Sequence, residues 1–385
     1  MKIGNWARLL LLAAAPVLVG FQAGCGNFWQ APGGSTTTPT STLSSGVFYV
    51  LNQETKQVAG YSIVSGTLTS VTGSPYTLSA APYTIAIAPS GAFLYVGTAQ
   101  GIYLYTVGSG GALTLANNSS VISSDLANTM QVDSTGAWLL EAGPNLAELI
   151  AIPINSSTGA PTSTIEQTAQ LPAATVYQLA ISPDNTHVFV ALGSSGTEEV
   201  IFAAGSTTPF GNATNIAVKN SAGSAVSVAV DPSNRLFYVG ETAATSGTNS
   251  GGLRAFNYNT LTEVTGSPYS IGGLAPYAIL PTSTGDYVYV ANRTVSGSSA
   301  GNIFGFSFTS TGTVYSLTAL SSTASAGTTP VGLAEDSQGN YLLVVDSGGN
   351  PDLEAYTMSS GALTSALTSS TGTDPVQASA VAAAP

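Results

Sequence analysis

The sequence is poor in charged residues, cysteine and histidine. Charged residues make up only 7% of its 385 residues, and there is one cysteine and one histidine. A single cysteine cannot form a disulfide within the chain. One histidine and no second thiol also make a typical zinc site unexpected. We therefore predict no metal site and no bound cofactor.

Basic residues are scarce too, with seven Lys and Arg against 19 Asp and Glu. Two of the seven, Lys2 and Arg8, lie in the N-terminal segment, and without them five basic and 19 acidic residues give a net charge of −14. Proteins that bind nucleic acid neutralise its phosphates with clustered Lys and Arg. The sequence has no such cluster, so nucleic acid is excluded as a partner.

The N-terminus has the form of an export signal. Two basic residues precede an apolar run at 9–20, which is too short to span a bilayer. The only cysteine follows in the segment 22–25 (QAGC), which resembles a bacterial lipobox, with Gln22 where such motifs usually carry Leu. The resemblance implies that Cys25 is lipidated and anchors the protein to a membrane. Ordinary secretion with cleavage nearby is the alternative.

Three segments are expected. Residues 1–25 form the signal that ends at Cys25, residues 26–45 a flexible linker rich in Ser, Thr and Pro, and residues 46–385 the folded domain. Gly rather than Asp follows the cysteine, which by analogy with enteric bacteria favours the outer membrane. We expect a monomer in the periplasm or at the outer membrane or cell surface.

The folded region is built on an internal repeat. A strand, a tight turn and a second strand recur at intervals of 45 to 54 residues, beginning at 82, 127, 176, 225, 276, 330 and 375. Third and fourth strands follow each pair, as at 102–106 and 111–114. Four strands in roughly fifty residues are typical of a propeller blade. We therefore predict an all-β fold, a seven-bladed β-propeller with four-stranded blades.

The two ends of the chain complement each other. The first strand, 47–51, matches the second strand of the repeat, and the missing first strand is found at 375–382. Adding the C-terminal strand to the N-terminal blade closes the ring and leaves no unpaired edge. A β-sandwich would not repeat this regularly, and a parallel β-helix has shorter repeats.

The repeat also resembles a known family. The pattern x-Ile-Ala-x-x-Pro-x-Gly-x-x-Leu-Tyr-Val at 84–96, with Gly-Ala-Leu-Thr at 111–114 and 361–364, is similar to bacterial lactonase-type seven-bladed propellers. These include 6-phosphogluconolactonase, carboxymuconate-cyclase-like proteins and the related YVTN repeat proteins. The resemblance covers about residues 45–385. It implies the propeller fold and, as an activity, lactone hydrolysis.

The catalytic residues that this resemblance implies are absent from the expected places. The resemblance implies that active members carry Arg and His at the start of an inner strand near the central channel. The equivalent positions here hold other residues, at 82–84 (PYT), 176–178 (VYQ), 276–278 (PYA) and 330–332 (PVG). No catalytic set is identified, and this favours a function other than catalysis.

The single histidine and the recurring aspartates are expected to be structural. His187 begins a second strand on the face away from the expected ligand mouth, where it is predicted to be a solvated neighbour of a turn. A general base must lie within reach of the substrate, so a Ser-His-Asp triad is not expected. Asp133, Asp184, Asp231 and Asp336 recur at the turn between first and second strands, where Asp bonds its own backbone.

The candidate site is the mouth of the channel, where the second strands end. Long loops follow at 241–252 and 292–302, and function concentrates in loops carried by a rigid scaffold. The residues expected to converge are Glu241, Asn292, Arg293, Asp346 and Asp352, with Tyr83, Tyr177 and Tyr277 lining the rim. Such an oxygen-rich mouth suits Ca²⁺, but no calcium-loop spacing is present. The alternative is a set of solvated strand ends that never meet.

These observations favour a lipid-anchored propeller that presents a binding surface at the cell envelope. Its ligand is expected to be a small molecule, a polymer or a protein. A lactone hydrolase of the family named above is the alternative function.

Overall fold

The computed structural model describes residues 46–64, 67–144, 146–242, 251–293, 300–321, 324–348, 352–368 and 377–385. The predicted signal and linker, with Cys25, lie outside the described residues, as does most of the two long loops. Among the described residues no helix is long and apolar enough to cross a membrane.

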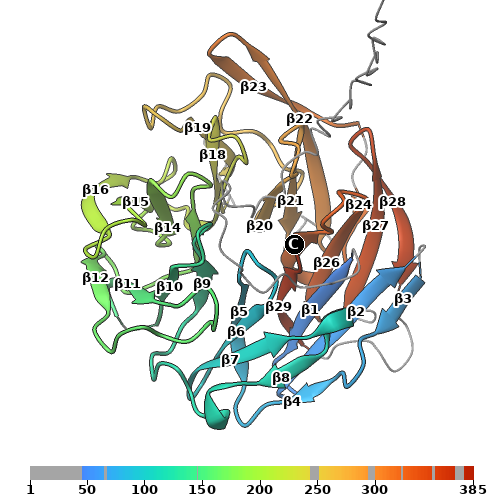
Figure 1. Ribbon diagram of the computed structural model, residues 1–385. Coiled ribbons are helices and arrows are strands. Elements are labelled where there is room, and N and C mark those ends of the chain that lie inside the picture. The colour runs from blue at the N-terminus through green and yellow to red at the C-terminus, as the bar shows by residue number, and fades with distance from the viewer. Residues whose placement is uncertain are drawn as a thin grey trace, which may run out of the picture.

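Seven antiparallel sheets stand in a ring (Figure 1), and we number them as blades 1 to 7. Their inner strands line a central channel. Blade 1 contains β29 (Ala378–Ala383), β1 (Val47–Asn52), β2 (Gln57–Val64), β3 (Thr67–Ser70) and β4 (Tyr76–Thr77). Blade 2 contains β5 (Pro82–Ile87), β6 (Phe93–Thr98), β7 (Gly101–Val107) and β8 (Leu113–Leu115), with short 3-10 turns at Ser109–Gly111 and Asn117–Ser119. Blade 3 contains β9 (Thr129–Val132), β10 (Trp138–Ala142), β11 (Glu148–Pro153) and β12 (Gln167–Gln170).

The remaining blades follow in chain order. Blade 4 contains β13 (Gln178–Ile181), β14 (His187–Ala191), β15 (Thr197–Phe202) and β16 (Phe210–Ile216), and blade 5 contains β17 (Ala225–Val230), β18 (Leu236–Glu241) and β19 (Gly252–Asn257). Blade 6 contains β20 (Pro276–Pro281), β21 (Tyr287–Asn292), β22 (Asn302–Thr311), β23 (Val314–Ala319) and β24 (Ala324–Ser325). Blade 7 contains β25 (Thr328–Glu335), β26 (Tyr341–Gly348), β27 (Leu353–Ser359) and β28 (Ala362–Thr368).

The predicted ring closure is confirmed. The C-terminal strand β29 pairs antiparallel with β1, with Phe48 opposite Ala383 and Val50 opposite Val381. The first blade is thus assembled from both ends of the chain, with β29 as its inner strand. The outer segment of blade 5 departs from the regular pattern, because isolated bridges at Phe256–Glu263 and Leu253–Tyr269 replace a full fourth strand.

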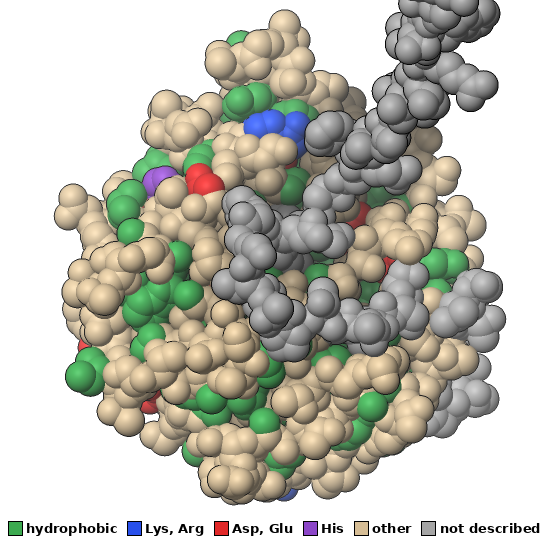
Figure 2. All heavy atoms as spheres, in the orientation of Figure 1, with side chains coloured by type: hydrophobic (Ala, Val, Ile, Leu, Met, Phe, Trp, Pro, Cys, Tyr) green, Lys and Arg blue, Asp and Glu red, His purple; other side chains and the backbone are tan. Residues whose placement is uncertain are grey.

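The core lies between the blades, in seven apolar layers, one at each interface. A central strand such as β6 or β18 is buried along its whole length, because neighbouring blades cover both of its faces. This explains why the second strands are nearly continuous apolar runs. On the face shown in Figure 2, charged side chains are sparse, in keeping with the composition.

A tyrosine in the second strand ties several blades to their neighbours. The hydroxyl of Tyr49 donates to the carbonyl of Gly111 at 2.7 Å, and Tyr95 does the same to Gly159 at 2.8 Å. Tyr289 repeats the contact in blade 6, donating to Gly361 at 3.0 Å. Tyr238 occupies the same place in blade 5, but its buried hydroxyl has no hydrogen-bond partner in the described part of the chain.

The aspartates at the inner turns have the predicted structural role. Asp133 accepts hydrogen bonds from the backbone N–H groups of Ala137 and Trp138 at 2.8 and 2.7 Å. Asp336 accepts two equivalent bonds in blade 7, both at 2.6 Å. These bonds close the turn that joins the first and second strands, and leave little of either carboxylate for a ligand.

Candidate functional site

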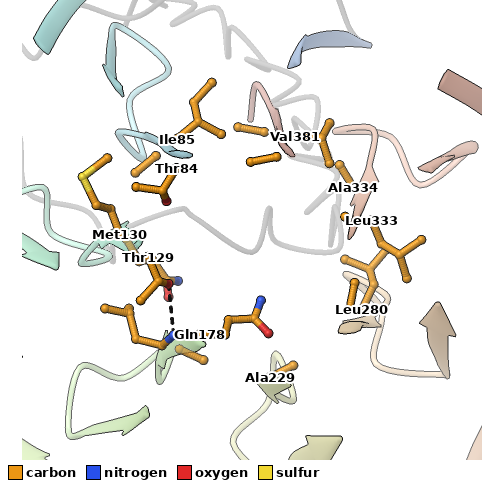
Figure 3. A pocket seen from close by; sticks show the side chains of 18 of the residues that line it. Thr84, Ile85, Thr129, Met130, Gln178, Ala229, Leu280, Leu333, Ala334 and Val381 are labelled. Atoms are coloured by element: carbon orange, nitrogen blue, oxygen red, sulfur yellow. Dashed lines mark hydrogen bonds between the residues drawn. The ribbon is translucent and has the colours of Figure 1, made fainter. Parts of the chain in front are cut away.

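The seven inner strands enclose a channel of about 770 Å³. Its walls combine polar and apolar side chains, and Figure 3 shows the apolar residues Ile85, Met130, Leu280, Leu333 and Val381. Inner strands of neighbouring blades are not joined by a sheet, so small and apolar residues pack them around the axis. A cavity of this size is ample for a small organic ligand.

Three polar side chains on the channel wall hold inner strands of neighbouring blades together. The Thr129 hydroxyl accepts a hydrogen bond from the N–H of Leu179 at 3.1 Å (Figure 3). The Gln131 and Gln178 carbonyl oxygens accept from the N–H groups of Ile181 and Val228 at 2.9 and 3.0 Å. These bonds link blades 3, 4 and 5. These side-chain oxygens therefore already serve the fold, because each accepts a hydrogen bond from a neighbouring blade.

One basic side chain lines the channel, at the mouth where the inner strands begin. The Arg293 guanidinium carbon lies 3.5 Å from the centre of the Tyr277 ring, and Tyr177 meets Tyr277 edge-on at 6.3 Å. Arg293 Nε also donates to the Pro330 carbonyl at 3.4 Å. The structure thus brings together three of the residues predicted for this mouth. Tyr83 also lines the channel.

Arg293 has no carboxylate partner among the described residues, where every salt bridge involves another cation. Burial lowers the pKa of its guanidinium, while the adjacent Tyr277 acts in the opposite direction. An arginine remains charged at neutral pH even so. Among the described residues, the mouth therefore holds a positive charge without a countercharge, stacked on an aromatic ring.

Glu241 was predicted at this mouth, but the structure places it inside blade 5. It is buried and forms an ion pair of 2.5 Å with Arg254, and it accepts a hydrogen bond from the Lys219 N–H at 2.9 Å. Arg254 extends the network to Glu263 at 3.0 Å. The register explains the pair, since Arg254 lies opposite Val239, two residues before Glu241 on the adjacent strand.

Asn292 is likewise buried within its blade. Its amide nitrogen donates to the Ile271 carbonyl and to the Asn302 side-chain oxygen, both at 2.9 Å. These contacts fix the loop segment that follows blade 5 against the end of β21. Asn292 does not line the channel, although Arg293, the next residue, does.

Asp346 and Asp352 lie together in blade 7, away from the channel lining. Asp346 is fully buried, and burial together with the nearby negative charge of Glu354 raises its pKa to about 8. Its backbone N–H donates to the Asp352 carbonyl at 2.9 Å, and the Asp352 carboxylate accepts from the Gln377 N–H at 3.1 Å. The predicted acidic residues therefore do not converge with Arg293.

The prediction that His187 is a solvated residue is wrong. Its side chain is 19% exposed, and its Nδ1 lies 2.6 Å from a Glu199 carboxylate oxygen. The ring also meets Tyr258 edge-on, with centres 4.8 Å apart. Sequence reasoning missed Glu199 because it lies on the adjacent strand, opposite Phe189 rather than His187. His187 does not line the channel, as expected.

Two acidic residues were missed by sequence reasoning. Glu335 lines the far end of the channel, where it accepts a hydrogen bond from the Ser283 N–H at 2.6 Å and burial raises its pKa to about 7. Glu141 is buried in the second strand of blade 3. The signal was present, because both replace a residue that is apolar in the other blades: Ile87 is equivalent to Glu335, and Val96 to Glu141.

Comparisons with known proteins place the chain by its fold. No family model and no curated protein sequence matches it. Among solved structures, a periplasmic gluconolactonase from Pseudomonas aeruginosa has a TM-score of 0.68 at 15% identity, over 89% of this chain and 100% of that one.

Two structures from Bacteroides, provisionally assigned as 6-phosphogluconolactonases, are similar in the same way. The Bacteroides fragilis protein has a TM-score of 0.68 at 14% identity, over 89% of this chain and 99% of that one. The Bacteroides uniformis protein has a TM-score of 0.66 at 16% identity, over 88% of this chain and 99% of that one. At these identities the likeness shows the fold alone, and the chain is a seven-bladed propeller of the architecture that these lactonase-like proteins share.

Proposed function

We propose that this protein is an exported, lipid-anchored propeller that binds a small organic anion at the Arg293 mouth of its channel. One observation carries the proposal, namely a guanidinium lining a cavity of about 770 Å³ without a carboxylate partner among the described residues. The sequence has far more acidic than basic residues, so this positive charge is unusual within it.

The surroundings of Arg293 favour a carboxylate or phosphate group as the part of the ligand that is recognised. Tyr277 covers one face of the guanidinium and Pro330 accepts one N–H. The remaining N–H groups suit the paired oxygens of such an anion. Ser379 adds a channel-lining hydroxyl with no hydrogen-bond partner among the described residues. Tyr83 and Tyr177 supply aromatic surface at the rim for the body of the ligand.

Isothermal titration calorimetry with gluconate and 6-phosphogluconate tests this site. Arg293→Gln is expected to weaken binding by about ten- to a hundredfold, because a hydrogen bond to a charged group contributes about 1.5–3 kcal/mol. Arg293→Lys keeps the charge but loses the planar contacts, so its affinity should lie between those of the wild type and Arg293→Gln. Lys56→Gln removes one exposed cation elsewhere and is the matched control. Equal loss in Lys56→Gln and Arg293→Gln, or no binding to the wild type, would contradict the proposal.

Lactone hydrolysis is the second candidate, supported by the names of the structural neighbours. The chemistry of the described mouth does not favour it. Neither His187 nor any carboxylate accompanies Arg293 there, and Glu335 and Asp336 line the far end and accept backbone N–H groups. A lactone panel decides between the two functions. Hydrolysis above the spontaneous rate that is lost in Arg293→Gln and kept in Lys56→Gln would favour the enzyme.

Export and anchoring are tested separately. Cys25→Ala should abolish incorporation of a labelled fatty acid while the protein is still made. Labelling that persists in this variant would overturn the lipidation proposal without affecting the proposed channel site.

A further inference from the structure

A second pocket lies between blades 2 and 3, apart from the channel. It has a volume of about 280 Å³, and none of the residues that line it belongs to the channel lining. Its polar wall comes from the segment that joins the two blades, with Ser123 and Asp125, and from Glu166 just before β12. Ile152 of β11 forms part of the apolar floor.

The two carboxyl groups of this wall both lie close to the Ser123 hydroxyl. Asp125 and Glu166 lie within hydrogen-bond reach of each other, and burial and Asp125 raise the pKa of Glu166. The Ser123 hydroxyl donates to Asp125 at 2.7 Å and lies 3.5 Å from Glu166. Two carboxylates this close repel each other when both are ionised. A bound cation would remove that repulsion.

A third carboxyl group lies behind this pair. Glu141 is 0% exposed, and neither of its carboxylate oxygens has a hydrogen-bond partner in the part of the chain that the structure describes. It lies opposite Ile150 in the sheet, on the face that carries the pocket residue Ile152, and burial with the negative charges of Asp125 and Glu166 raises its pKa. A buried carboxyl without a donor is costly to the fold.

The described part of the chain supplies no cation to this region. No Lys or Arg occurs between Lys56 and Lys219, a stretch that includes all of blades 2, 3 and 4. The ion pairs among the described residues lie in blades 4 and 5. The three carboxyl groups are therefore left without a countercharge from the described protein.

We propose that this pocket binds the ammonium group of an organic amine. No group of three acidic, histidine or cysteine side chains in the described residues is arranged to hold a metal ion. A larger cation that donates N–H hydrogen bonds fits the carboxyl pair better. Leu126 and Ile165, next in sequence to Asp125 and Glu166, are 43% and 69% exposed. They offer apolar surface to an alkyl chain attached to the ammonium group.

The roles of the residues follow from their positions. Asp125 and Glu166 accept hydrogen bonds from the ammonium group, and Glu141 adds negative charge from behind without touching the ligand. Because the pKa values of Glu141 and Glu166 are raised, the binding of a cation should release protons from the pocket. This site is independent of Arg293 and of the channel.

Calorimetry of the full-length protein with hexylamine tests the proposal, with hexanol and hexanoate as uncharged and anionic counterparts of the same chain length. Hexylamine should bind, and the measured enthalpy should vary with the ionisation enthalpy of the buffer. Glu166→Gln and Asp125→Asn should each weaken binding at least tenfold. Glu148→Gln is the matched control, since it removes a carboxylate of the same blade that Gln170 contacts outside the pocket.

Several outcomes would overturn the proposal. Hexanol binding as tightly as hexylamine would show an apolar site, and stoichiometric binding of Ca²⁺ that is lost in Glu166→Gln would show a metal site instead. Equal affinities of Glu166→Gln and Glu148→Gln, with unfolding transitions like that of the wild type, would show that the pocket carboxylates do not bind the amine. Arg293→Gln should leave hexylamine binding unchanged, so failure of the channel site and of this pocket can be told apart.

Discussion

Blades 3 and 5 treat a buried glutamate in opposite ways. Glu241 in blade 5 lies 2.5 Å from Arg254 and accepts hydrogen bonds from the Lys219 backbone. Glu141 in blade 3 is equally buried, yet it has no hydrogen-bond partner in the described chain and its charged neighbours are acidic. The first carboxylate is explained by the fold, whereas the second is not. An unpaired buried acid next to a pocket is therefore the better indication of a ligand.

The difference arises on the neighbouring strand. In blade 5, the third strand β19 carries Arg254 close to Glu241, and the segment after it adds Glu263. In blade 3, the third strand β11 places Ile150 opposite Glu141. The same propeller framework thus encloses a paired carboxylate in one blade and, among the described residues, a carboxyl group without a partner in another.

The largest expected effect is the loss of the cation in blade 5. Arg254→Met leaves Glu241 buried without its partner, and removing one member of a buried pair costs about 3–5 kcal/mol. Urea unfolding at pH 7 measures the change. The double variant Glu241→Gln with Arg254→Met should recover part of the loss, because the remaining group is neutral.

Lys219→Met is the control for this experiment, because its ion pair with Glu263 is half-exposed and should contribute at most about 1 kcal/mol. If Arg254→Met were no more destabilising than Lys219→Met, Glu241 would not depend on its partner, and the contrast between the two blades would fail.

In blade 3 we expect a smaller effect on the free energy of unfolding, and there the substitution should stabilise the protein. Burial, with Asp125 and Glu166, raises the pKa of Glu141 from about 4.5 to about 8. Between these values the folded state holds a proton that the unfolded chain has released, so this group makes stability fall as pH rises. Glu141→Val, which restores the residue found in blade 2, should stabilise the protein by about 1–3 kcal/mol at pH 9.

Urea unfolding of the wild type and Glu141→Val at pH 5 and pH 9 checks this prediction. The difference between the two proteins should be larger at pH 9. The pKa of Asp346 is also raised, but Asp346 is present in both proteins, so its contribution to the pH dependence cancels in the comparison. A stability difference that did not grow between pH 5 and pH 9 would show that Glu141 is already ionised at pH 5 in the folded protein, and would contradict the raised pKa.

The architecture was predictable because it depends on a repeat. The strand pairs follow from a residue pattern that recurs along the chain, and the turn aspartates recur in four blades. The complementary chain ends predict the ring closure, and β29 pairs with β1 as expected. Arg293 and Tyr277 lie against each other at one mouth of the channel. They flank an antiparallel pair in which Pro276 lies opposite Asn292, so the repeat itself brings them together.

The environment of individual acids was not predictable from position alone. Glu241 ends its strand in the same way as Asn292, but its burial depends on Arg254, which a long loop brings back beside it. Asp346 is buried by the return of the chain at Asp352. These contacts vary from blade to blade, whereas the repeat describes only what the blades share.

The smallest expected effect extends the comparison to the second-strand tyrosines, which are paired in some blades and unpaired in blade 5. Tyr95→Phe removes the hydrogen bond to the Gly159 carbonyl and leaves that buried acceptor without its donor, which should cost about 1–2 kcal/mol. Tyr238→Phe removes a buried hydroxyl that has no partner among the described residues, so it should be neutral or slightly stabilising. Both changes delete one oxygen from an equivalent buried position. Their difference in urea unfolding therefore isolates the hydrogen bond from the packing of the ring, and equal losses would mean that the tyrosine hydroxyls do not hold the blades together.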